Sequence, residues 1–419
     1  PMSSQNILFV NIRALHGAWP EGAPRRPLAG AALTSWPVLY NAWMWVKNGR
    51  IAAVGTGTPP PEAESAQKED LKNAIVIPGF CDSHTHAVFP AWRTEEYADK
   101  LAGLSYSEIA ARGGGILNSA RKVASMSEDE LYQLALVRVQ EMILMGTTAL
   151  EIKSGYGLEP EHELKMLRVI QRLARHLPIP VQATCLAAHA VPLQYKSNKA
   201  LFIQRICEEL LPAVASEGLA TFVDVFCEKD FFTPEESHQI LEKALSLGFK
   251  IKVHAHQLGR SGGVEVGTRL HAHSVDHLEY LHEEDIEAIR QSGTIATVLP
   301  IAAWFLNLPY PPVRQMLEKE VPMAIATDFN PGSAPSCSMW LALALACTAM
   351  KMQPTEAFAA ATINGAFAMD VGHMCGSLSP GYRADFIAIH DVSSLPEIVY
   401  RFHFQMKYDI YILGARITY

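Results

Sequence analysis

Apolar runs and amphipathic stretches alternate through the middle of the chain. Runs of apolar residues predict eight strands, at 75–81, 147–152, 180–186, 222–226, 249–253, 272–276, 294–299 and 322–327. Between them, stretches such as 161–176 and 233–248 carry charges at helical spacing. The second of these opens with Thr233 before Pro234, a good pair for the start of a helix, and closes at Gly248. This alternation is typical of a parallel sheet with crossover helices.

Eight such units in series favour a closed barrel over an open, doubly wound sheet. No glycine fingerprint for a dinucleotide follows any of the predicted strands, which argues against the open alternative. In a barrel, the chemistry lies where the strands end at their carboxyl-terminal face. Polar residues directly after the predicted strands are therefore the candidates to examine.

The two ends of the chain have a different residue pattern, in which short runs of strand-forming residues are separated by Pro/Gly-rich stretches. Asn48-Gly49 lies between two apolar runs and predicts a hairpin. We therefore predict an α/β protein, a (β/α)8 TIM-like barrel with a small β-sandwich domain formed by the N- and C-terminal segments. The small domain would comprise residues 1–76 and 374–419, and the barrel residues 77–373.

Composition narrows the class of protein. Hydrophobic residues make up 49% and charged residues 19%, enough for a large core. The net charge of -8, with no basic block, argues against a nucleic-acid partner. The apolar stretch 339–350 is too short to span a membrane, and the first residues lack the layout of a signal peptide. The seven cysteines form no CxxC pair. We expect a soluble, cytoplasmic protein with reduced thiols.

The segment PGFCDSHTH places His84 and His86 just beyond the first predicted barrel strand. Residues two apart on an extended strand project the same way, so both imidazoles can reach one metal ion. His254, His277 and Asp328 also follow predicted strands. A lone histidine at a strand end is more often structural, but five polar groups at four strand ends indicate a shared site. Nitrogen and oxygen ligands without thiolate suit zinc or non-haem iron.

These five residues, at these strand ends, resemble the amidohydrolase superfamily. Seven further strings resemble one family within it, the imidazolonepropionases, whose members open a ring amide in histidine degradation. They run from residue 84 to 335 and read HTHAVFPAWR, YSEIAARGGGI, EIKSGYGL, LAAHA, DVFCE, SVDHLEYL and ATDFNPGSAP. The terminal segments fit that family's small β domain.

The resemblance implies one metal ion per chain, Zn²⁺ or Fe³⁺, held by His84, His86, His254 and Asp328. It implies hydrolysis of 4-imidazolone-5-propanoate to N-formimidoyl-L-glutamate, with His277, Asp328 and Gln257 as catalytic residues. The substrate would contact Arg93, Tyr106, Tyr156, His189, Gln257, Asn330, Gly332 and Ser333.

The chemistry of these residue types agrees with that substrate. A propionate tail calls for a cation that can form a bidentate pair, and Arg93 is a natural candidate. Tyrosine offers a flat face and a hydroxyl to an imidazolone ring. The glycine run 113–115 lets backbone N–H groups approach an anion, or is a plain loop.

One segment departs from many relatives, which carry HADE where this chain reads HAHQ, residues 254–257. Gln257 can hold a substrate by hydrogen bonds but cannot carry a proton at neutral pH. The role of general base then falls on His277, Asp328 or both. For His256, a surface position is an equal alternative.

Other interpretations stay open at this point. A carbamylated Lys153 would imply two metal ions, although relatives that use such a lysine place it after the fourth strand. Another cyclic-amide hydrolase or a deaminase of the superfamily would share the metal ligands, and a scaffold without activity is a rival of another class. Relatives are often dimers, but no isolated apolar stripe marks an interface for a homodimer.

Overall fold

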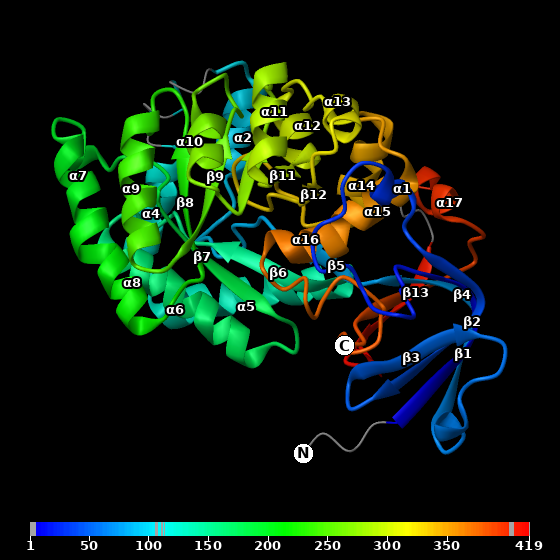
Figure 1. The fold of residues 1–419 in the computed structure, drawn as a ribbon. Coiled ribbons are helices and arrows are strands. Elements are labelled where there is room, and N and C mark those ends of the chain that lie inside the picture. Colours follow the sequence, from blue (N-terminus) through cyan, green and yellow to red (C-terminus); the bar gives the residue numbers. More distant parts are fainter. Residues whose placement is uncertain (1–5, 105–107, 110–111, 113, 402–405, 419) are drawn as a thin grey trace.

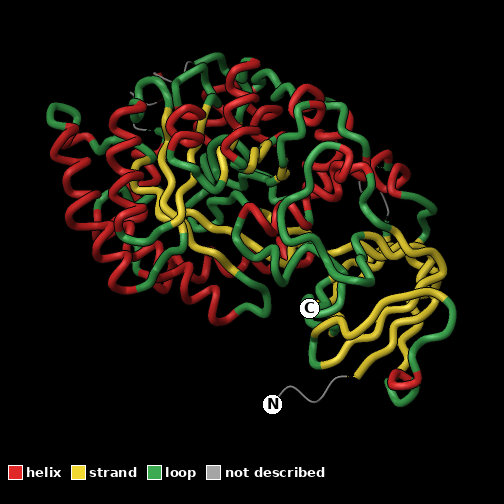
Figure 2. Tube along the Cα trace, viewed as in Figure 1, coloured by secondary structure: helices red, strands yellow, loops and turns green. Residues whose placement is uncertain are grey.

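The computed structural model describes residues 6–104, 108–109, 112, 114–401 and 406–418. Two sheets organise these residues. One forms a barrel surrounded by helices, and the other forms a smaller unit that lies beside it and contains both ends of the described chain (Figures 1 and 2).

The barrel is built from eight parallel strands in sequence order. They are β5 (Phe80–Asp82), β6 (Thr147–Lys153), β7 (Val181–Ala188), β8 (Phe222–Cys227), β9 (Lys250–Ala255), β10 (Ser274–His277), β11 (Ile295–Val298) and β12 (Met323–Ile325). Beyond β5 and β12 the chain closes the ring through a bridge between Thr85 and Phe329. Asp328 N donates to His84 O at 2.9 Å, and His86 N donates to Phe329 O at 2.8 Å. The predicted barrel is confirmed.

Helices cover the outside of the barrel (Figure 1). They are α2 (Thr94–Leu101), α4 (Ile116–Ser125), α5 (Glu128–Leu144), α6 (Pro160–His176), α7 (Lys199–Arg205), α8 (Leu211–Glu217), α9 (Pro234–Ser246), α10 (Gly263–Arg269), α11 (Glu283–Ser292), α12 (Pro300–Leu306), α13 (Val313–Glu318), α14 (Met339–Thr348), α15 (Pro354–Ala361) and α16 (Ile363–Ala368). A π-helical turn, Ile206–Leu210, joins α7 to α8. The predicted start of α9 is confirmed, because Thr233 and Glu236 form a reciprocal capping box.

The small unit is a single seven-stranded sheet in the order β15-β14-β13-β4-β1-β2-β3. Its strands are β1 (Asn6–His16), β2 (Val38–Lys47), β3 (Arg50–Thr56), β4 (Gln67–Pro78), β13 (Phe386–His390), β14 (Lys407–Ile412) and β15 (Ala415–Arg416). Two short helices from the same chain segments, α1 (Ala31–Thr34) and α17 (Leu395–Tyr400), pack instead against the barrel helix α15. The sheet curls, since Arg50 of β3 bridges to Arg383 just before β13. Phe9, Phe386 and Tyr411 pack in its core, with the last two rings stacked 4.4 Å apart.

Two details of this sheet bear on the predictions. The Asn48-Gly49 hairpin is confirmed, with φ of 49° and 74° at the two turn residues. The apolar run 75–81, predicted as one barrel strand, is instead divided between the sheets: β4 ends at Pro78 and β5 begins at Phe80. At the junction, a Cβ on Gly79 would stand 2.1 Å from Thr148 Oγ1 of β6, so only glycine fits.

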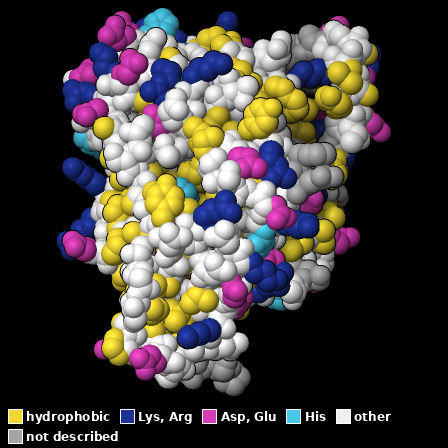
Figure 3. All heavy atoms as spheres, turned by 90° about the vertical axis from the view of Figure 1, so that its right-hand side faces the viewer, with side chains coloured by type: hydrophobic (Ala, Val, Ile, Leu, Met, Phe, Trp, Pro, Cys, Tyr) yellow, Lys and Arg dark blue, Asp and Glu magenta, His cyan; other side chains and the backbone are white. Residues whose placement is uncertain are grey.

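The charged side chains of the described residues form no large patch of one sign on the face shown in Figure 3. On that face, basic and acidic side chains of the described residues are interspersed rather than gathered by sign. Among the described helices, none combines the length and the apolar character needed to cross a membrane.

Candidate active site

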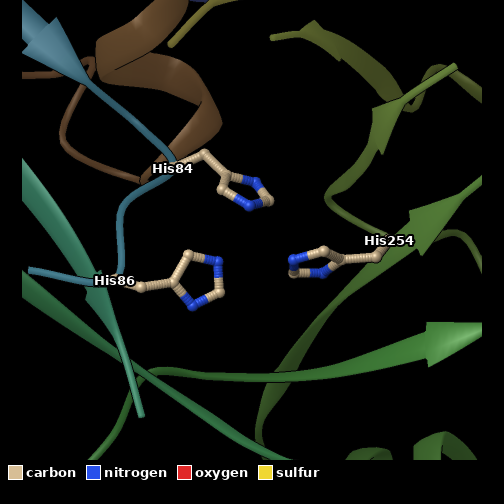
Figure 4. Close-up of side chains that lie close together, drawn as sticks. All are labelled: His84, His86 and His254. Carbon is tan, nitrogen blue, oxygen red and sulfur yellow. The ribbon is translucent and has the colours of Figure 1, made fainter. Parts of the chain in front are cut away.

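Five sequence-predicted residues come together at the carboxyl-terminal end of the barrel. His84 and His86 follow β5, His254 lies in β9, His277 ends β10, and Asp328 follows β12. All five are at most 3% exposed. The side chains of His84, His86 and His254 point toward one common centre (Figure 4). The geometry therefore gathers, within one buried space, groups that lie up to 244 residues apart in sequence.

The distances within this cluster suit a single metal ion. One nitrogen each of His84, His86 and His254 lies within 4.8 Å of the others, and atoms of His84, His277 and Asp328 form a second such group. Asp328 Oδ1 lies 3.4 Å from His84 Nε2 and 3.3 Å from His86 Nε2. Three imidazoles and a carboxylate form a donor set typical of zinc or iron.

Carboxylates behind two of the histidines fix which nitrogen faces the centre. His84 Nδ1 is 2.6 Å from Asp276 Oδ2, and His254 Nδ1 is 2.9 Å from Asp224 Oδ2. The Nε2 atoms of both histidines have no hydrogen-bond partner among the described residues, although both are buried. A carboxylate placed against Nδ1 leaves the Nε2 lone pair of each imidazole for a metal ion, so these two histidines fit a metal site.

Burial also sets the charge of the cluster. Desolvation lowers the pKa of His254 to about 4 and lowers the pKa of His86 as well. Burial opposes ionisation of Asp328, yet the imidazoles of His84 and His86, 3.4 and 3.3 Å from its Oδ1, hold the pKa of that carboxyl well below its usual value. Neutral imidazoles and an ionised carboxylate are the forms that bind a metal.

The backbone around the cluster adopts conformations that non-glycine residues rarely take. The φ angle is 56° at His256, 86° at His277, 74° at Leu278 and 55° at Asp328. Such positions cost energy and cluster at functional sites, where the surrounding structure holds them. Here they turn the chain at the tips of three strands, β9, β10 and β12.

Arg93, Tyr156 and His189 lie together beside this cluster. His189 stacks on His86 with ring centroids 5.5 Å apart, and its Nδ1 lies 2.9 Å from Gly155 O. Tyr156 is 5.9 Å from the His86 ring. The Arg93 guanidinium lies over the Tyr156 ring at 5.4 Å. A cation and flat rings therefore line the space next to the histidines.

Ser119 of α4 holds the Arg93 side chain. Its Oγ accepts from Nε at 3.1 Å and from Nη2 at 3.0 Å, which leaves Nη1 free of that contact. Gly332 lies against the free nitrogen, since a Cβ at that position would be 2.5 Å from Nη1. Sequence reasoning found Arg93 and Gly332 but missed Ser119, because nothing in its local sequence marks it.

The predicted residues after β12 form a tight turn. Asn330 Nδ2 donates to Asp328 O at 2.6 Å and to Ser333 Oγ at 2.8 Å. Asn330 Oδ1 accepts from the backbone N–H groups of Gly332 and Ser333 at 2.8 and 2.7 Å. The asparagine side chain is thus engaged in shaping the turn. Tyr106, the remaining predicted residue, lies outside the described residues.

Gln257 and His256 are both buried. Gln257 is 6% exposed, and its backbone N–H donates to Glu228 Oε1 at 2.5 Å. His256 is fully buried and faces Glu265 at 3.4 Å and Asp285 at 3.7 Å. The alternative that His256 is a surface residue is therefore excluded.

Lys153 forms ion pairs beneath the cluster. Its Nζ is 2.8 Å from Glu151 Oε1 and 2.9 Å from Asp224 Oδ2. A carbamate there would bring a negative charge against two carboxylates, which disfavours the two-metal alternative. Sequence reasoning assigned no role to Asp224 or Asp276, although a charged residue within an apolar strand, FVDVF or SVDH, was the available signal.

Comparisons with known proteins agree with this geometry. The sequence profile of the amidohydrolase family matches residues 75–407. The imidazolonepropionase of Christiangramia forsetii is 44% identical over 98% of this chain and 100% of its own length. That of Flavobacterium johnsoniae is 44% identical over 93% of this chain and 95% of its own.

Solved structures show the same fold at lower identity. A guanine deaminase from C. acetobutylicum with bound guanine has a TM-score of 0.70 at 16% identity, covering 99% of this chain and 100% of that chain. An adenosine deaminase from Xanthomonas campestris with bound zinc has a TM-score of 0.70 at 17% identity, covering 99% and 93%. The chain belongs to the amidohydrolase family and, within it, to the imidazolonepropionase group.

Proposed function

We propose that this protein hydrolyses the ring amide of 4-imidazolone-5-propanoate to N-formimidoyl-L-glutamate. The observation that carries the proposal is the placement of Arg93 and Tyr156 beside the buried histidine cluster. A guanidinium suits the propionate, an aromatic face suits the planar ring, and the cluster lies next to both. The identity of 44% to imidazolonepropionases over nearly the whole chain supports the same substrate.

The proposed metal ligands are His84, His86, His254 and Asp328, which would hold one Zn²⁺ or Fe³⁺. The unpartnered Nε2 atoms of His84 and His254 support this set. When bound, the metal would supply the Lewis acidity that ionises water near neutral pH.

The remaining roles fall to side chains of the chain itself. Arg93 binds the propionate and Tyr156 contacts the ring, which fixes the face of the ring that water attacks. Water oxygen adds to the ring carbonyl carbon while Asp328 accepts a proton, and His277 stabilises the developing oxyanion. The ring C–N bond then breaks and the leaving nitrogen takes up the proton. Gln257 contributes hydrogen bonds without carrying the proton, because an amide does not titrate near pH 7.

The ligand set is tested by metal content and turnover measured on the same samples. His254→Ala and Asp328→Ala should each lose both, whereas the exposed His271 gives a matched control variant, His271→Ala, that keeps both. Full metal and full turnover in either ligand variant would overturn the assignment.

The rival activities are other ring hydrolyses and deaminations within the family. Guanine and adenosine, assayed beside the imidazolone at equal concentration, test them directly. We expect turnover of the imidazolone alone. Deamination of a purine with no turnover of the imidazolone would move the assignment to a deaminase.

A further inference from the structure

Beneath the histidine cluster lies a group of charged side chains that the proposed reaction does not use. Its members are fully buried and come from four barrel strands: Glu151 and Lys153 of β6, Asp224 of β8, Lys252 of β9 and Asp276 of β10. Burying a charge costs free energy unless an opposite charge is paired with it, so five buried charges in one group suggest that the group has a function.

Lys153 is the centre of this buried group. Its Nζ is 2.8 Å from Glu151 Oε1, 2.9 Å from Asp224 Oδ2 and 4.0 Å from Asp276 Oδ2. The same Oδ2 atom of Asp224 lies 2.9 Å from His254 Nδ1. One ammonium therefore contacts the carboxylate oxygen that orients a histidine of the cluster.

Lys153 also contacts the carboxylate that holds His84. Asp276 Oδ2, the atom that faces Lys153, is also 2.6 Å from His84 Nδ1. The two carboxylates that hold these imidazoles thus both face Lys153, and Lys252 adds a second positive charge near Asp276. Without Lys153, the carboxylates would repel each other and turn away from the imidazoles in the low-dielectric interior.

We propose that Lys153 is a positioning residue for the metal site, acting through Asp224 and Asp276 on His254 and His84. It holds the two carboxylates against the Nδ1 atoms of the two imidazoles, which keeps both Nε2 lone pairs aimed at the common centre. The inference rests on the proposed metal ligands but is independent of the proposed substrate. A protein that binds metal without hydrolysing the imidazolone would leave it standing.

The experiment measures zinc affinity by competition with a chromogenic chelator, first on the wild-type protein and then on Lys153→Met. Removing a residue that orients metal ligands weakens binding by about 10- to 100-fold, and we expect a loss in that range. The visible absorption spectrum of the Co²⁺-loaded protein should change as well, because the geometry of two ligands is altered. Neither readout requires substrate.

Lys252→Met is the matched control. Lys252 is equally buried, but its ion pair is with Glu151 at 3.5 Å, and its Nζ donates to Ser83 O at 3.1 Å. Its charge also lies near Asp276, but it makes no ion pair with Asp224, so we expect this variant to lose stability and to lose clearly less zinc affinity than Lys153→Met. Equal losses of affinity in both variants, or unchanged affinity in Lys153→Met, would overturn the proposal.

A double variant keeps the test open if Lys153→Met does not fold. Asp224→Asn together with Lys153→Met removes one negative and one positive charge, so the net charge of the buried group is unchanged. In the Asp224→Asn background Lys153 acts only through Asp276, its longer contact at 4.0 Å, so its removal should weaken zinc binding by less than about tenfold. A further tenfold loss on removal of the lysine would contradict the proposed route.

Discussion

Glu163 of α6 supports the loop that carries Tyr156, and its removal makes a quantitative test. The carboxylate is fully buried and accepts from three backbone N–H groups: those of Gly155 at 3.1 Å, Gly157 at 2.8 Å and Leu158 at 2.8 Å. The loop needs this support because Gly155 and Leu158 have φ of 106° and 62°. One side chain thus fixes the backbone on both sides of Tyr156.

The magnitude follows from those three contacts. Glu163→Ala leaves three buried donors without a partner, at about 1 kcal/mol or more each, so the free energy of unfolding should fall by at least about 3 kcal/mol. Glu163→Gln keeps an oxygen near the two 2.8 Å contacts and loses only their charge-assisted strength, about 1–2 kcal/mol. KM should rise more in the alanine variant, since Tyr156 loses its support.

Urea unfolding of wild type, Glu163→Gln and Glu163→Ala gives the free energies, and initial rates on the imidazolone give KM. The expected order is wild type above glutamine above alanine in stability, with the reverse order in KM. An alanine variant within 1 kcal/mol of wild type, or one as stable as the glutamine variant, would refute the reasoning.

Three further predictions concern single side chains. Ser119→Ala removes the hydrogen bonds to Nε and Nη2 of Arg93. A loss of about 1 kcal/mol in substrate binding corresponds to a rise of about fivefold in KM with kcat unchanged, and a fall in kcat alone would contradict this. Gly332→Ala places a Cβ 2.5 Å from Arg93 Nη1 and should raise KM with little change in melting temperature, and an unchanged KM would show that Arg93 does not bind substrate where it lies. Burial lowers the pKa of His16 from 6.5 to about 4, so the unfolded chain binds the proton more readily and stability should fall by about 3 kcal/mol as pH drops from 6.5 to 4. His16→Phe keeps the stack on Trp36 and should melt with less dependence on pH, whereas parallel pH curves would exclude this origin.

The barrel could be predicted from sequence because its strands are short apolar runs separated by helices with clear caps. The predicted and observed strands β6 to β11 differ by a few residues at their ends. The division of run 75–81 between two sheets could not be foreseen. Hydrophobicity indicates that a strand is buried but not against which sheet, and the steric demand on Gly79 comes from Thr148, far along the chain.

The candidate site could be predicted in part for a similar reason. Residues at the carboxyl-terminal ends of barrel strands must converge, so His254 and Asp328 were recognisable from position alone. Lys153 and Asp276 were not, because their meaning depends on which strands lie opposite each other beneath the site. Ser119 and Glu163 act on the backbone or on another side chain, and no local motif reveals such a partner.

The most direct test of the central claim is conversion of freshly prepared 4-imidazolone-5-propanoate, followed by its ultraviolet absorbance. Metal per chain is determined on the same sample, and the product is identified by mass spectrometry. We expect rapid loss of absorbance, one metal ion per chain, N-formimidoyl-L-glutamate as product, and no conversion after chelation. A chain that carries one metal ion yet leaves the imidazolone unchanged would contradict the account.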